Sequence, residues 1–170
     1  GYDTAVFNEP VEEIAATLQA GGELVEQVLA HPYPVVAAVN GHAIAQGAFT
    51  MLACDVRLGV RADVKIGLNE VAIGLTIPHY GVEMARHQLA PAWFDHATVT
   101  GTLYDAEGAQ AAGFVHELVA VDELQASARE WASRLAVLDM TAHAGTLARV
   151  RAPVLAAIRD GLSHEFVLPG

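Results

Sequence analysis

The sequence predicts an α/β fold, and three patterns along the chain support this prediction. A continuous apolar run, Val35–Val39, has the length and composition of a strand that is covered on both faces of a sheet. Short runs of this kind then alternate with segments of helical periodicity, which indicates helices layered on a sheet. After Val121 the pattern is helical throughout. We therefore expect a core at residues 1–120 and a helical oligomerisation region at residues 121–170.

The order of the elements follows from apolar spacing and from residues that begin or end helices. Asn8 is expected to cap a first helix, with Pro10 in its first turn. A turn at 42–47 follows the first strand and leads into an apolar helix. Asp105 is expected to cap a short helix that ends at Gly113. The other expected elements are strands at 56–60, 64–68 and 114–119, and helices at 80–89, 91–100, 122–138 and 141–164, the last with a break before Pro153.

The turn after the first strand suggests a chemical role. Asn40-Gly41 ends the strand, and the apolar residues after Gly47 continue as a buried helix. The first turn of a helix presents backbone N–H groups without helical partners, together with the positive end of the helix dipole. Directed at a substrate carbonyl, such N–H groups form an oxyanion hole. A nearby carboxylate, for which Glu70 is the candidate, would then transfer protons.

A series of motifs between residues 34 and 115 resembles the crotonase superfamily of enoyl-CoA hydratases and isomerases. The matching segments are PVVAAVNG (34–41), HAIAQG (42–47), CD (54–55), NE (69–70), GLTIP (74–78), TVTG (98–101) and AEGAQAAGFV (106–115). The resemblance implies a spiral core of β-β-α units of the ClpP/crotonase type and a C-terminal helical region that builds a trimer. Because family members carry further strands before the matched part, it also implies that N-terminal strands are missing from this sequence.

The resemblance also implies roles for particular residues. Glu70 occupies the position of the second of two catalytic glutamates in hydratases. Gln46 occupies that of a glycine whose backbone N–H stabilises the thioester oxygen. The positions expected to line the substrate pocket are His42, Ala45, Gly47, Phe49, Asn69, Pro78 and His79. The substrate would be an acyl-CoA or enoyl-CoA thioester, so coenzyme A is part of the substrate and no separate cofactor is expected.

Two departures from the family pattern bear on the reaction. Phe49 stands where the first glutamate would be, and its side chain cannot transfer a proton. Gln46 replaces a glycine, which costs backbone freedom but keeps the N–H. One carboxylate suffices to move a double bond, because it can take a proton from C2 and return it at C4. We therefore expect an enoyl-CoA isomerase or hydratase, with isomerisation favoured. The alternative is a catalytically weak or inactive homologue that binds acyl-CoA.

Each candidate residue also has a purely structural interpretation. Glu70 could be a polar residue at the end of a strand, and Phe49 has the spacing of a core residue. His42 fits a turn. His79, with Tyr80, either brings a titratable ring near the thioester or fills space. The eight histidines show no ligand spacing, so no metal is expected.

Charge and composition exclude several partners. The formal net charge of −11 argues against nucleic acid or an anionic membrane surface, because both require a basic partner. With nine Lys and Arg residues in all, contacts to the phosphates of coenzyme A must be local. No apolar run has the length and purity of a membrane span, and no basic-apolar leader opens the sequence. The lone Cys54 indicates a reduced thiol, so we expect a cytoplasmic protein.

A hydrophobic content of 53 %, with a mean hydropathy of +0.33, indicates surfaces that are buried again in an oligomer. We expect a homotrimer or a dimer of trimers. The C-terminal apolar residues that support this expectation are Leu124, Trp131, Leu135, Leu138 and Leu155.

Overall fold

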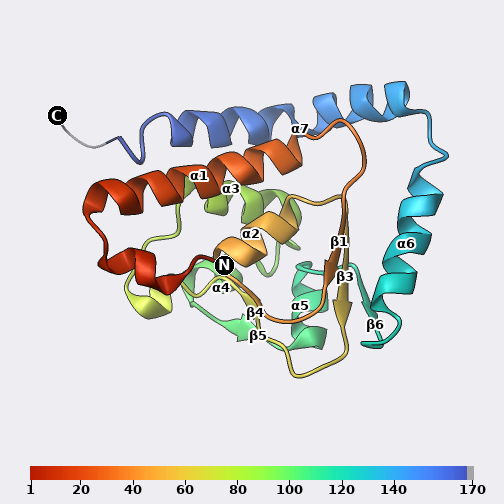
Figure 1. Ribbon diagram of the computed structural model, residues 1–170, viewed down its shortest axis with the longest axis horizontal. Coiled ribbons are helices and arrows are strands. Elements are labelled where there is room, and N and C mark those ends of the chain that lie inside the picture. Colours follow the sequence, from red (N-terminus) through yellow and green to blue (C-terminus); the bar gives the residue numbers. More distant parts are fainter. Residues whose placement is uncertain (168–170) are drawn as a thin grey trace.

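Two three-stranded sheets lie at the centre of the computed structural model, which describes residues 1–167 (Figure 1). In the first sheet all strands are parallel and the order is β1 (Val36–Val39), β3 (Val56–Val60), β6 (Glu117–Val119). In the second, β4 (Ile66–Gly67) pairs in parallel with β2 (Ala43–Ile44) and antiparallel with β5 (Leu103–Tyr104). The chain thus passes repeatedly between the two sheets.

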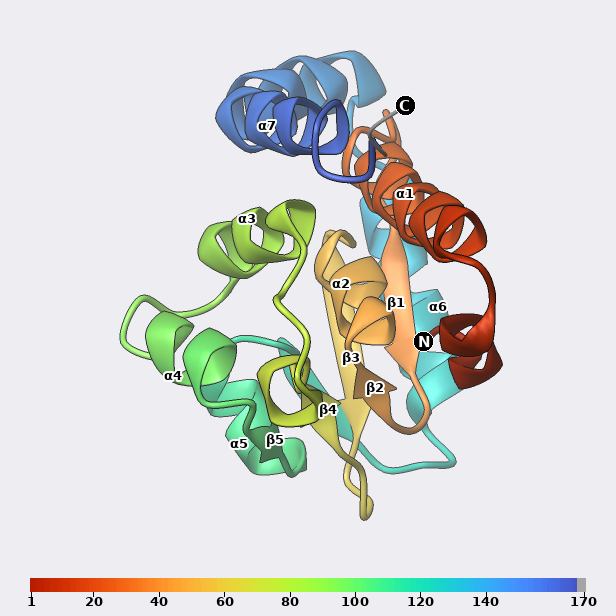
Figure 2. The ribbon, with the colours of Figure 1, turned by 90° about the vertical axis from the view of Figure 1, so that its left-hand side faces the viewer.

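Helices cover both faces of the first sheet. Figure 1 shows α6 (Leu124–Leu135) on one side and α2 (Gln46–Leu52) on the other. Figure 2 shows α2 between α1 (Val11–Leu29) and α3 (His79–Gln88). Helix α7 (Met140–Leu162) packs over α1 and α3. The remaining helices are α4 (Phe94–Val99), α5 (Ala106–Ala112) and the short 3-10 turns η1 (Thr4–Asn8) and η2 (Val71–Ile73).

Strands β1 and β3 of the first sheet differ in burial. All residues of the central strand β3 are buried, as expected of a strand between two helical layers. The edge strand β1 is half-buried along its whole length, which is less burial than the prediction of a strand covered on both faces implies. The physical reason is its position, since only β3 pairs with β1 among the described residues and one edge of β1 stays open.

Helix ends agree with the sequence where a local capping residue determines them. Asp105 accepts a 2.8 Å hydrogen bond from the Gly108 N–H and caps α5, and Gly113 ends it at φ +92°, both as predicted. Asn8 does not cap α1, because it ends η1 and Pro10 takes the cap position instead.

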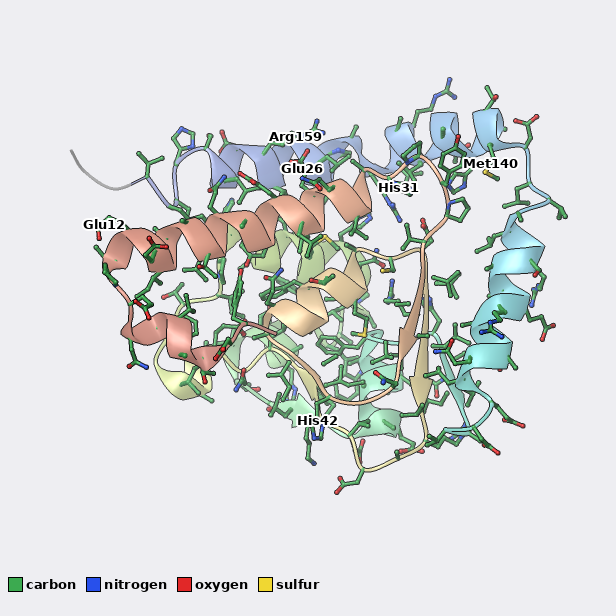
Figure 3. The ribbon with its side chains drawn as sticks, viewed as in Figure 1. Glu12, Glu26, His31, His42, Met140 and Arg159 are labelled. Carbon is green, nitrogen blue, oxygen red and sulfur yellow. The ribbon has the colours of Figure 1, made fainter. Side chains whose placement is uncertain are left out.

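The C-terminal helices pack on the core of their own chain. Leu124 and Leu155 are 2 % and 8 % exposed, so these two do not supply the free apolar surface that the sequence suggested. The expected break before Pro153 was also wrong, since α7 continues through it. Pro153 is exposed while Val154 next to it is buried, so packing of the inner face holds the helix together despite one lost hydrogen bond. An ion pair of 2.7 Å between Arg159 and Glu26 joins α7 to α1 (Figure 3).

Candidate active site

The turn between β2 and α2 has an unusual backbone conformation. Ala45 has φ +55° and ψ −120°, the one positive φ among the non-glycine residues described. Its N–H donates a 3.0 Å hydrogen bond to the Gly67 carbonyl and so continues the pairing of β2 with β4. The first bond inside α2 runs from the Phe49 N–H to the Ala45 carbonyl at 3.0 Å. The N–H groups of Gln46, Gly47 and Ala48 therefore stand at the start of the helix, before its internal hydrogen bonds begin.

Strand pairing brings Glu70 to the same edge of the second sheet. Because β2 and β4 are parallel, with Ile44 opposite Gly67, both leave the sheet at the same end. The first continues into Ala45 and Gln46, and the second continues through Leu68 and Asn69 to Glu70. The loop after Glu70 is fixed by its own backbone, since the Glu70 carbonyl accepts hydrogen bonds from the N–H groups of Ile73 (3.0 Å) and Leu75 (2.9 Å).

The Glu70 side chain lies out of water with one oxygen unsatisfied. Glu70 is 5 % exposed, and its Oε2 has no hydrogen-bond partner among residues 1–167. Burial raises the pKa of the Glu70 carboxyl group, because the charged form loses its hydration. A buried carboxylate with a free oxygen and a raised pKa has the properties of a general base for carbon acids.

The Gln46 side chain turns away from its own N–H and into a buried hydrogen-bond network. Its Nε2 donates to the Gly21 carbonyl of α1 at 2.9 Å, and its Oε1 accepts from the Tyr80 hydroxyl of α3 at 2.8 Å. The Tyr2 hydroxyl lies 3.3 Å from that of Tyr80. Tyr80 and Tyr2 were not among the site residues predicted from the sequence, and the one local sign of their packing was the Gly21-Gly22 pair inside a helix.

Phe49 belongs to the core. Its ring is 1 % exposed and meets the Tyr80 ring edge to face, with 5.5 Å between centroids. It also lies so close to Gly81 that a Cβ there would come within 2.5 Å of the Phe49 Cζ atom. The position that the family resemblance assigns to a first glutamate is therefore occupied by a packed aromatic ring, which carries no titratable group.

The site residues expected from the sequence fall into two groups, according to whether they line the groove beside α1. His42, Gln46 and Gly47 line a groove of about 700 Å³ between α1 and the strands β1 and β2. His42 is exposed and lies at the lower edge of the molecule in Figure 3, and its Nδ1 accepts a 2.8 Å hydrogen bond from the Lys65 N–H. Residues that do not line this groove are Ala45, Phe49, Asn69, Glu70, Pro78 and His79.

His79 is held against the C-terminal helix. Its N–H, at the start of α3, donates to the Glu165 carboxylate at 2.8 Å. Its ring contacts Gly161, where a Cβ would come within 2.7 Å of the His79 Cδ2 atom. Half-buried Pro78 precedes it as the cap residue of α3, and half-buried Asn69 precedes Glu70 in the loop after β4. The structure thus gives His79 a packing contact with α7. Glu70 and Gln46 lie in the segments that follow the paired strands β4 and β2.

Two negative findings concern the described part of the chain. No three His, Cys, Asp or Glu side chains within residues 1–167 approach one another closely enough to hold a metal ion. No helix in this range is both long and apolar enough to cross a membrane.

Comparison with known proteins agrees with the fold and the motif series. The sequence profile of the enoyl-CoA hydratase/isomerase family matches residues 2–164. A probable enoyl-CoA hydratase, EchA17 of Mycobacterium tuberculosis, is 32 % identical over 146 residues, which cover 86 % of this chain and 51 % of that protein.

Solved structures of crotonase-type proteins superimpose closely on the chain. An enoyl-CoA hydratase/isomerase family protein from Pseudomonas syringae gives a TM-score of 0.95 at 38 % identity, covering 98 % of this chain and 72 % of that one. An enoyl-CoA isomerase from Mycobacterium tuberculosis gives a TM-score of 0.91 at 38 % identity, and the match covers 96 % of this chain and 71 % of that one.

The α/β core with C-terminal helices matches the structures of crotonase-like proteins. The chain belongs to the enoyl-CoA hydratase/isomerase family. It spans about half the length of the curated relatives that it matches.

Proposed function

We propose that the protein acts on enoyl-CoA thioesters, with Glu70 as acid and base and the Gln46 backbone N–H as a donor to the thioester oxygen. The observation that carries this proposal is the Glu70 carboxyl group, which is buried and has a free oxygen. It follows β4, and the parallel partner of that strand, β2, leads into the strained turn before Gln46. Family membership supports a thioester substrate, since relatives carry the names of enoyl-CoA hydratases and isomerases.

We favour isomerisation over hydration because the site supplies one carboxylate. Glu70 takes a proton from C2 of a 3-enoyl thioester, and the electrons pass to the thioester oxygen as an enolate. The Gln46 N–H stabilises the negative charge on that oxygen. The enolate then re-forms the carbonyl as Glu70 returns the proton to C4, which leaves the double bond between C2 and C3. Adding water would call for a second proton-transfer group, and Phe49 occupies that position in the core.

The test supplies the protein with a 3-enoyl-CoA and, separately, a 2-enoyl-CoA, and follows the absorbance of the conjugated thioester. An isomerase converts the first and gains absorbance. Glu70→Gln should then lower kcat by about 10²- to 10⁴-fold, the usual contribution of a general acid–base group. Glu12→Gln, an exposed glutamate on α1, is the matched control and should keep its activity (Figure 3).

Two other outcomes favour different functions. Loss of absorbance with the 2-enoyl-CoA would identify a hydratase. Binding of acyl-CoA without turnover of either substrate would support the alternative, a catalytically weak or inactive acyl-CoA-binding homologue, which the replacements at Gln46 and Phe49 favour.

Assembly and location are further parts of the proposal. We propose a homotrimer, or a dimer of trimers, that forms through the C-terminal helices and works in the cytoplasm. The large apolar side chains that remain exposed among the described residues of this region are Val121, Val137, Leu138, Val150 and Val167. A monomer in sedimentation experiments on the purified protein would contradict this assembly.

A further inference from the structure

The Gln46 side chain joins three helices at one buried point. It is 6 % exposed and extends from the start of α2, between α1 and α3 (Figure 2). Its Nε2 donates to the Gly21 carbonyl on α1 at 2.9 Å and approaches the Thr50 Oγ1 at 3.3 Å. Its Oε1 accepts the Tyr80 hydroxyl proton from α3 at 2.8 Å. Both polar ends of the amide are therefore used within the chain.

Two glycines of α1 make room for this network. A Cβ at Gly21 would clash with the Tyr2 hydroxyl and come within 3.0 Å of the Gln46 Cδ atom. One at Gly22 would clash with the Leu162 side chain and come within 2.9 Å of the Tyr80 Cδ1 atom. Glycine inside a helix lowers its stability, so residues with a Cβ would be better helix formers at both positions. The absence of a Cβ at these two positions lets Tyr2 and Gln46 approach Gly21, and Leu162 and Tyr80 approach Gly22.

The network holds a strained piece of backbone. Ala45, which precedes Gln46, has φ +55°, and such a conformation persists in a non-glycine residue when its surroundings constrain it. On one side the Ala45 N–H is bonded to the Gly67 carbonyl at 3.0 Å. On the other, the Gln46 side chain is fixed by Gly21 and Tyr80. Hydrogen bonds to β4, α1 and α3 therefore fix the turn on both sides.

We propose that Tyr80 and the Gln46 side-chain amide are positioning groups, which hold the Ala45–Gln46 turn so that the Gln46 N–H meets the thioester oxygen. This inference rests on the proposed function. A glutamine at a position that is glycine in the family pattern would otherwise be free to change rotamer and backbone angles. The Tyr80 hydroxyl removes this freedom by bonding the amide oxygen in a buried site.

The decisive experiment is a double-mutant cycle between Tyr80 and Gln46. Tyr80→Phe removes one hydroxyl and keeps the ring that packs on Phe49. In the protein with Gln46, kcat for a 3-enoyl-CoA should fall about 10- to 100-fold with KM changed less than about threefold, because the N–H is misplaced while substrate binding is kept. In the Gln46→Gly background the same Tyr80→Phe change should alter kcat less than about threefold, because no side-chain amide is left to position.

Tyr104→Phe is the matched control. The Tyr104 hydroxyl is also hydrogen-bonded, at 2.6 Å to the His96 Nδ1, and it has no contact with Gln46. Its removal tests what loss of a tyrosine hydroxyl does to this fold in general, and kcat should stay within about threefold of wild type. Equal losses of kcat from Tyr80→Phe in both backgrounds, or from Tyr80→Phe and Tyr104→Phe alike, would overturn the proposal.

A second measurement does not depend on turnover. The Phe49 N–H bonds to the Ala45 carbonyl, so its hydrogen-exchange rate reports how firmly the turn is held. Tyr80→Phe should speed this exchange about tenfold or more, while Tyr104→Phe should not. If wild type converts neither enoyl-CoA, the proposed function fails. Faster exchange of the Phe49 N–H in Tyr80→Phe would then still support the proposal that Tyr80 fixes the Ala45–Gln46 turn. Unchanged exchange would overturn that proposal.

Discussion

Arg151 on α7 and Asp55, just before β3, form an ion pair of 2.7 Å although 96 residues separate them in the chain. The second oxygen of Asp55 accepts a 2.6 Å hydrogen bond from the Val35 N–H, and Arg151 also donates to the Leu29 carbonyl at 2.7 Å. The pair thereby ties the end of α1 and the starts of β1 and β3 to the C-terminal helix. With side chains 8 % and 17 % exposed, the two charges are largely desolvated.

Removing one partner of this pair should destabilise the protein strongly. We expect Asp55→Ala to lower the free energy of unfolding by about 3 kcal/mol, because the buried Arg151 charge and the Val35 N–H both lose their partner. Urea unfolding measures this. Glu107→Ala breaks the exposed Arg61–Glu107 pair and should cost less than about 1 kcal/mol. Comparable losses in the two variants would contradict a structural role for the Asp55–Arg151 pair.

Asp55 also illustrates which parts of the structure were predictable. It belongs to the CD segment at 54–55 that the sequence comparison singled out, but no local pattern could identify Arg151 as its partner. Helix ends that depend on local chemistry, such as Asp105 and Gly113 around α5, were predicted correctly. Two-residue strands such as β2 and β5 were missed, because a run of two residues is too short to show a period.

In the candidate site, too, residues in local motifs could be predicted, whereas contacts made by tertiary packing could not. Gln46 and Glu70 could be proposed from the sequence because each lies in a contiguous motif, and the pairing of β2 with β4 places the two motifs after neighbouring strands. Tyr80 was not found as a partner of Gln46, because α3 reaches α2 only through tertiary packing. A pair of glycines within an otherwise helical pattern, as at 21–22, was the available signal that bulky side chains approach that helix closely.

The strain at Ala45 leads to a prediction about stability. Ala45→Gly should raise the free energy of unfolding by about 1 kcal/mol, because relief of a positive φ outweighs the extra freedom that glycine gives the unfolded chain. Ala16→Gly, at an exposed position inside α1, should lower it by about 1 kcal/mol. The same substitution is thus expected to act in opposite directions at the two positions. A loss of stability in Ala45→Gly would show that the turn is not strained.

Gly81 should tolerate no larger side chain. A Cβ at this position would lie 2.5 Å from the Phe49 Cζ atom and 2.7 Å from its Cε1 atom. Because the ring sits in a packed core, Gly81→Ala should cost about 1–3 kcal/mol of stability by overpacking. A second change, Phe49→Leu, should recover part of this loss by shortening the side chain.

Gly145 provides the control for that experiment. It lies inside α7 with open space where a Cβ would be, so Gly145→Ala should stabilise the protein by about 1 kcal/mol through helix propensity. Thermal unfolding of both variants separates packing from propensity. Stabilisation by Gly81→Ala would contradict the tight contact between α3 and Phe49.

The raised pKa of Glu70 makes stability depend on pH even without substrate. Because burial holds the carboxyl proton more tightly in the folded chain, the folded state binds more protons than the unfolded state between the ordinary pKa and the raised one. Stability therefore falls as pH rises through this window. The loss is absent below the ordinary pKa and complete above the raised one.

Glu70→Gln removes this dependence. The free energy of unfolding of the variant, minus that of wild type, should increase as pH rises through the window and then level off. Urea unfolding at a series of pH values measures it, with Glu12→Gln as the exposed reference. A difference that stays constant with pH would contradict a raised pKa for Glu70.

The same ionisation should govern catalysis in the opposite direction. Glu70 accepts a proton from C2 as the carboxylate, so kcat/KM with a 3-enoyl-CoA should fall as pH drops through the pKa of the free enzyme, tenfold for each pH unit well below it. This midpoint should coincide with the upper end of the window in which wild type loses stability relative to Glu70→Gln. Agreement between the two pH dependences would identify one buried carboxyl group as the cause of both. A rate midpoint at the ordinary pKa of an exposed glutamate would mean that a different group takes the proton.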